Sequence, residues 1–126
     1  MKLRLTRQRF KELVEEAIRQ LPSKLQSYLS NVLIQIQSRP TREQLRQWNI
    51  PSTVHLLGFY HGVPVSKRSK DDTWRLPDEI YIFQESIEKV CTGDEAVRKE
   101  IRQTVWHEIA HHFGFDEKEI DEWERY

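Results

Sequence analysis

Five residues near the end of the chain, His107-Glu108-Ile109-Ala110-His111, form its most specific pattern. On a helix, residues four apart lie on the same face, with Cβ atoms about 5–6 Å apart. The imidazoles of His107 and His111 can therefore reach one metal ion at the usual Zn–N distance of about 2.0–2.1 Å. Glu108 points about 100° around the helix from His107, beside the metal but not bound to it. The pattern predicts a zinc site in which Glu108 is the general base for a zinc-activated water.

The residues after the motif favour a catalytic site over a structural one. Gly114 follows three residues after His111, and glycine is the usual left-handed residue where a helix ends. The chain can then turn back and bring an acid over the metal as third ligand. We expect Glu117, which has the spacing of the third ligand in H-E-x-x-H-x-x-G-x-x-H proteases. Asp116 is the alternative, although its spacing from Glu119 also suits a helix cap.

Two other interpretations of the motif stay open. A chance match on a helix would leave two partly exposed histidines and a surface glutamate. A zincin-like fold can also belong to a protein that binds metal weakly or cuts nothing, because a fold does not guarantee activity. The alternative to a zinc peptidase is therefore a non-catalytic metal-binding or protein-interaction module.

Length and composition narrow the class of protein. A chain of 126 residues has room for one domain, over residues 1–126. It has no run of 18 apolar residues that would suggest a membrane span, and its N-terminus lacks the apolar run of a secretory signal. The single cysteine, Cys91, cannot form an internal disulfide and favours a cytoplasmic location.

Charge is unevenly distributed, although the net charge is zero. Residues 1–50 carry ten Lys or Arg against four Asp or Glu, and residues 51–126 carry ten against sixteen. A basic face for nucleic acid is one interpretation. We favour the other, in which the basic helices pack near the acidic C-terminal part, because charge asymmetry is a weak indicator. The expected partner is a peptide or protein substrate, with no membrane and no nucleic acid; the oligomeric state is left open.

Alternating and β-rich runs predict three strands, over residues 32–37, 54–60 and 78–84. A hairpin return through Val63 and Val65 is possible, and residues 66–73 read as a polar loop that could act as a lid. The strand around residues 80–84 can present an edge to an extended substrate, unless it lies buried within the sheet.

Helical spacing and capping patterns predict the remaining elements. Glu100, Thr104, His107 and His111 lie along one side of the motif helix, toward the site. His112 points toward the core side and is expected to be structural. Helices are predicted over about residues 7–20, over a shorter segment after Pro22, from Thr41 to about Trp48, from a capping box at residues 92–95 to about Phe113, and after Asp116.

Three stretches resemble a bacterial family of minimal zincin-like metallopeptidases. They are residues 56–64 (LLGFYHGVP), residues 76–83 (LPDEIYIF) and residues 104–114 (TVWHEIAHHFG), of which the last is the most specific. The resemblance covers nearly the whole chain. It implies an α+β, minimal zincin-like fold, in which the motif helix packs against a small mixed sheet, and a zinc-dependent peptidase activity with undefined substrates.

Stabilisers of the oxyanion, other than zinc, are not evident in the sequence. The polar side chains that could serve are those of Tyr60, His61, Arg75 and Tyr81. For each of them a structural role is the simpler interpretation.

Overall fold

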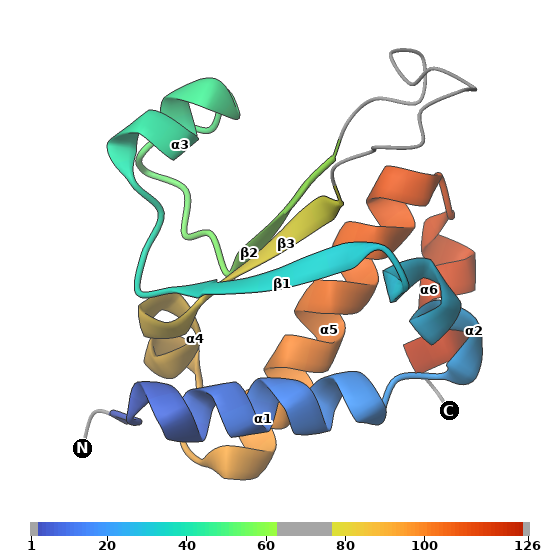
Figure 1. Cartoon of the computed structure of the whole chain (residues 1–126), viewed down its shortest axis with the longest axis horizontal. Coiled ribbons are helices and arrows are strands. Elements are labelled where there is room, and N and C mark those ends of the chain that lie inside the picture. Colours follow the sequence, from blue (N-terminus) through green and yellow to red (C-terminus); the bar gives the residue numbers. More distant parts are fainter. Residues whose placement is uncertain (1–2, 63–76, 125–126) are drawn as a thin grey trace.

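A small mixed sheet lies between helices in the computed structural model (Figure 1), which describes residues 3–62 and 77–124. Its strands are β1 (Val32–Gln37), β2 (Gly58–His61) and β3 (Asp78–Phe83), in the order β1-β3-β2. β1 runs parallel to β3, and β2 runs antiparallel to it. The fold is of the α+β class, with a small mixed sheet beside the motif helix, as the resemblance implies.

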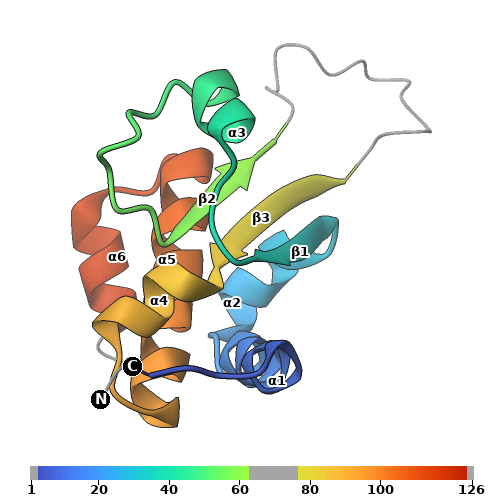
Figure 2. The ribbon, with the colours of Figure 1, turned by 90° about the vertical axis from the view of Figure 1, so that its left-hand side faces the viewer.

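Helices cover both faces of the sheet. Figure 2 shows α3 on one side of the strands and α1 on the other. The motif lies on the long helix α5, which packs against α1 and against the sheet. The helices are α1 (Arg7–Arg19), α2 (Ser23–Gln26) with a 3₁₀ turn at Ser27–Leu29, α3 (Arg42–Gln47), α4 (Gln84–Val90), α5 (Asp94–Phe113) and α6 (Glu117–Glu124).

The core lies between the inner face of the sheet, α1 and α5. Strand alternation turns Tyr60, Ile80 and Ile82 inward, and all three are buried. Burying each large apolar side chain contributes roughly 1.5–3 kcal/mol. The fully buried side chains on the two helices follow the helical period and include Phe10, Leu13, Val97, Ile101, Val105 and Ile109. This packing holds α5 firmly against the strands.

The outer face of the sheet is aromatic and is covered in part by α3. Thr41 begins this helix with the predicted capping box, in which its hydroxyl accepts from the Gln44 N–H at 3.0 Å. Trp48, just after the helix, stacks on Phe59 of β2 with ring centroids 4.2 Å apart and an interplanar angle of 15°. Its ring also lies 5.2 Å from that of Tyr81 on β3.

Ion pairs join the basic and acidic parts of the chain. Arg9 of α1 contacts Asp94 at the start of α5 at 2.8 Å, in line with the expected packing of the basic helix. Arg98 of α5 contacts Glu16 of α1, also at 2.8 Å. Such surface pairs contribute little stability each, and both of them join α1 to α5.

Three predictions about elements are wrong. Residues 54–57 were predicted as strand, but β2 begins only at Gly58. Val54 instead ends a turn, in which its N–H donates to the Pro51 carbonyl. Gln84 belongs to α4, a helix missing from the predictions, which buries Gln84 and Ile87. The predicted capping box at residues 92–95 is absent, since α5 begins after Gly93 without a side-chain cap.

The possible hairpin return and the polar loop at residues 66–73 lie outside the described residues. In the described part of the chain, no helix is long and apolar enough to cross a membrane.

Candidate metal centre

Helix α5 places the two motif histidines side by side. The ring centroids of His107 and His111 are 6.3 Å apart, and the rings are tilted by 31°. The Nδ1 atom of His107 lies 2.7 Å from the Gln103 carbonyl oxygen. A proton on Nδ1 satisfies this contact, and in that tautomer Nε2 is the nitrogen that can bind a metal, which is the usual arrangement for a ligating histidine. The pair therefore fits zinc as two of its ligands.

Glu108 contacts the neighbouring strand through the backbone. The N–H of Tyr60 donates to Glu108 Oε2 at 3.0 Å. Burial raises the pKa of Glu108 above its ordinary value, while the Tyr60 hydrogen bond and the nearby His111 and His107 lower it. Because the Tyr60 N–H points at Glu108 and not at β3, the edge of β2 that does not pair with β3 faces the motif. No signal in the sequence shows this contact, since its donor is a main-chain group.

The end of α5 turns the chain as the sequence predicts. Gly114 adopts the left-handed conformation, with φ 80°, and caps the helix. The next N–H, that of Phe115, donates to the Ala110 carbonyl at 2.8 Å. Asp116 then accepts the Glu119 N–H at 2.8 Å, which is the predicted cap of the final helix.

A third ligand is not defined by the described side chains. No group of three His, Cys, Asp or Glu residues within them is placed to hold a metal ion. Asp116 is occupied as a helix cap. Glu117 begins α6, but its side chain lies outside the described part of the structure. The choice between Glu117 and Asp116 thus stays a prediction.

His112, Tyr60 and Asp78 join α5 to the two strands. The His112 ring stacks on Tyr60 with centroids 4.0 Å apart. The Tyr60 hydroxyl donates to Asp78 Oδ2 at 2.6 Å, and His112 Nε2 lies 4.0 Å from the same oxygen. These contacts give His112 and the Tyr60 hydroxyl structural roles.

The remaining oxyanion candidates lie outside the motif. Tyr81 donates its hydroxyl to Glu79 at 2.6 Å, and this bond, together with burial, raises the pKa of Tyr81 to about 12. Arg75 lies outside the described residues. His61 is exposed on β2.

The substrate edge predicted on residues 80–84 is wrong. β3 is the central strand and pairs on both sides, with β1 and with β2. Its Ile80 and Ile82 are fully buried, so the alternative interpretation, a strand buried within the sheet, is the correct one. Among the described strands, β2 is the one with an edge beside the motif, on the side away from β3.

Two hollows lie beside this edge. The smaller, of about 290 Å³, lies between α5 and the chain before β2 and is lined by Leu57, Glu100, Thr104, His107 and Glu108, among others. Of the predicted polar line on α5, Glu100, Thr104 and His107 face this cleft, whereas His111 is not among the described residues that line it. The larger, of about 730 Å³, is lined mainly by aromatic rings, those of Trp48, Phe59, Tyr60, His61 and His112.

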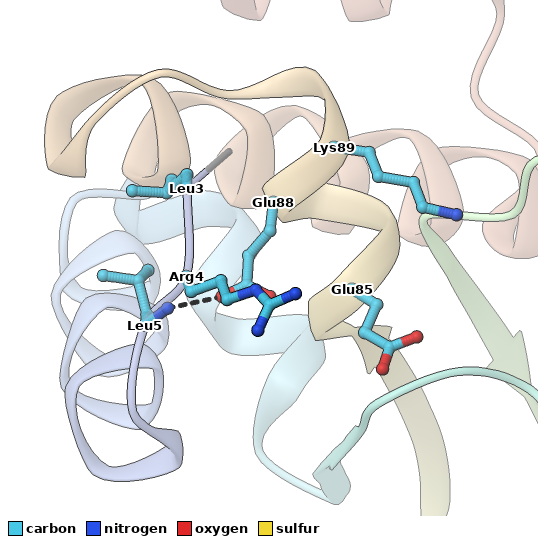
Figure 3. A pocket seen from close by; sticks show the side chains of 6 residues that line it. All are labelled: Leu3, Arg4, Leu5, Glu85, Glu88 and Lys89. Atoms are coloured by element: carbon cyan, nitrogen blue, oxygen red, sulfur yellow. Dashed lines mark hydrogen bonds between the residues drawn. The ribbon is translucent and has the colours of Figure 1, made fainter. Parts of the chain in front are cut away.

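A third hollow, of about 420 Å³, lies between the N-terminal segment and α4. Figure 3 shows Leu3, Arg4 and Leu5 beside Glu85, Glu88 and Lys89, with the Leu5 N–H donating to Glu88 at 2.6 Å. This contact holds the first residues of the chain on α4, and no residue of the motif helix lines the hollow.

Comparison with known proteins places the chain in one family. The family model described as zincin-like metallopeptidase matches residues 29–126. The chain belongs to the zincin-like metallopeptidase family. No curated protein matches it. The matched range includes the three strands, α5 and the motif, and it begins after α1.

Proposed function

We propose that the protein is a zinc-dependent metallopeptidase that hydrolyses peptide bonds in peptides or proteins of the cytoplasm. His107 and His111 hold the metal, with Glu117 as third ligand and Asp116 as the alternative. Family membership supports the class of activity. The histidine pair on one face of α5 supports the ligand set.

Zinc, when bound, polarises the carbonyl to be cleaved and lowers the pKa of a bound water to about 7. Glu108 acts as the general base: it accepts a proton from the attacking water and passes it to the departing amine nitrogen. Its carboxylate is held for this role by the Tyr60 N–H through Oε2. Oε1 makes no hydrogen bond with the described residues and can face the water.

The contact between Tyr60 and Glu108 carries this proposal. It supports Glu108 as the general base, because it holds the carboxylate beside the edge of β2 that does not pair with β3, along which an extended peptide could lie. The backbone of the peptide would then lie beside the carboxylate and the two histidines. Residues that line the two hollows would then contact the side chains of the peptide and select its sequence.

Cleavage of casein or a mixed peptide library by the zinc-loaded protein tests this function. Glu108→Gln keeps an acceptor for the Tyr60 N–H and should retain zinc while losing at least about 100-fold in rate, the usual range for a general base. Full zinc occupancy with no cleavage of varied peptides would favour the alternative, a non-catalytic metal-binding or interaction module.

A further inference from the structure

The smaller hollow extends along α5 away from the motif. The residues of α5 that line it are Glu100, Gln103, Thr104, His107 and Glu108. Their spacing of three and four residues places them along one side of the helix. At a rise of 1.5 Å per residue, Glu100 lies about 10 Å along the helix axis from His107. The hollow therefore connects the expected metal ligand with a carboxylate almost two turns away.

The facing wall is the chain that leads into β2. Residues 55–58 line the hollow from this side. His55 is held by a 3.1 Å contact between its Nε2 atom and the Ser86 carbonyl oxygen. At Gly58 the two walls meet closely, since a Cβ there would lie 2.6 Å from Thr104 Cγ2. Packing thus places both walls before a ligand arrives, which lowers the entropy cost of binding.

Glu100 is partly buried and makes no hydrogen bond or ion pair with the described residues. The nearest arginines along the helix do not neutralise it, because both point to α1. Arg98 contacts Glu16 at 2.8 Å, and Arg102 contacts Gln20. A carboxylate that is partly withdrawn from water and has no counter-ion is an unfavourable arrangement. A cation that entered the hollow would supply the missing partner.

The hollow suits one long cationic side chain. Its volume of about 290 Å³ lies below the roughly 300–1,000 Å³ of pockets that take a whole small ligand. No Lys or Arg is among the described residues that line it. Leu56 and Leu57 can cover the methylene groups of a Lys or Arg side chain while its charged head reaches Glu100.

We infer that Glu100 is a specificity-determining residue, which binds the Lys or Arg side chain of a peptide substrate at a residue beside the bond to be cleaved. The inference rests on the proposed function, because His107 and Glu108 set the position of that bond. It requires only that the side chain lies along α5, and no pairing of the peptide with β2. A free N-terminal amine one residue from the bond lies at most about 3.6 Å from it, too near the motif to reach Glu100.

Binding of peptides to the zinc-loaded Glu108→Gln protein tests the inference without cleavage. The probes are an alanine-rich octapeptide, acetylated and amidated, with one central Lys, and the same peptide with norleucine, which has the same carbon chain without the charge. The Lys peptide should bind on the order of tenfold more tightly, as expected for a hydrogen bond between charged groups. Glu100→Gln in the same protein should abolish this difference, and Glu100→Lys should favour a peptide with a central Glu.

Two controls guard against indirect effects. Glu95→Gln makes the same change of charge on the same helix, but Glu95 contacts Arg98, on the side of α5 that faces α1. This variant should keep the Lys preference. A norleucine peptide with a free N-terminal amine tests the other source of positive charge, and it should bind no more tightly than its acetylated form. Zinc content and Tm show which variants are folded and loaded.

Equal affinity for the Lys and norleucine peptides would overturn the inference, as would a Lys preference that persists in Glu100→Gln or is lost equally in Glu95→Gln. Tighter binding of the free amine would also overturn it, because the hollow would then take the end of the chain. Cleavage by the unmodified protein is scored separately. Lys preference without cleavage supports the role of Glu100 and contradicts the peptidase. Cleavage without Lys preference supports the peptidase and contradicts the role of Glu100.

Discussion

Tyr60 donates its backbone N–H to the carboxylate of Glu108 at 3.0 Å, across 48 residues of sequence. This bond joins the edge strand β2 to the motif helix at the residue expected to move protons. The position of Glu108 therefore depends on the packing of β2 as well as on its own helix.

Glu108→Gln should stabilise the metal-free protein at pH 7. Burial raises the pKa of Glu108, so the folded state binds its proton more tightly than the unfolded chain does. The stability that this group contributes is complete below its ordinary pKa of 4.5 and is lost as pH rises through the raised value. A glutamine does not ionise, so the variant keeps its stability as pH rises. Thermal unfolding in chelator should show a higher Tm at pH 7 and no gain below pH 4.5.

A Glu108→Gln protein that is less stable than the original at pH 7 would show that the buried, ionised carboxylate does not destabilise the fold. This result would point instead to net stabilisation by the Tyr60 N–H and the two histidines.

Tyr60→Phe should destabilise the fold by about 1–3 kcal/mol, because the buried Asp78 loses a hydrogen-bond donor. Tyr81→Phe is the matched control, since it removes a hydroxyl with the same 2.6 Å bond to a carboxylate from a more exposed position. Urea unfolding should show the larger loss for Tyr60→Phe. Equal losses would mean that burial of Asp78 does not set the strength of its bond.

The Tyr81 hydroxyl should lose its proton at a higher pH than an ordinary tyrosine does. The bond to Glu79 favours the neutral phenol and raises the pKa of Tyr81 from 10.0 to about 12. Folded-state stability from this group is present below pH 10 and falls as pH approaches 12. Absorbance titration of tyrosinate should show a component near pH 12 that moves toward 10 in Glu79→Gln. An unchanged titration in that variant would assign the late group elsewhere.

Gly58→Ala should weaken the contact between β2 and α5. A Cβ at Gly58 would lie 2.6 Å from Thr104 Cγ2 and 2.8 Å from the Tyr81 carbonyl oxygen. Overpacking of this kind costs typically about 1–3 kcal/mol. Gly93→Ala is the control, because nothing lies within 4 Å of a Cβ there and its backbone is extended. Similar Tm values for both variants would contradict the close packing.

Periodic parts of the sequence predicted their structure well. β1, α1 and α5 follow their apolar patterns, α3 begins at its predicted capping box, and Gly114 ends the motif helix as predicted. The helix α4 was missed because the strand pattern of residues 78–84 runs directly into it, without a glycine or proline between. The strand changes to a helix here because Ile87 packs into the core. Local sequence patterns do not show such a tertiary contact.

The candidate site could be predicted only in part. The spacing of His107, Glu108 and His111 follows from helix geometry, so it is readable in the sequence. The order of the strands is not, and it decided that β2, instead of β3, borders the motif. The Trp48–Phe59 stack likewise joins residues of separate elements, and its partners share no local pattern.

Zinc per chain, measured by elemental analysis of protein purified without chelator, tests the central claim most directly. The account predicts about one zinc per chain, lost in His111→Ala and kept in His112→Ala, whose imidazole packs on Tyr60. Absence of zinc after incubation with excess metal, or equal loss in both variants, would contradict a metal centre built on the motif.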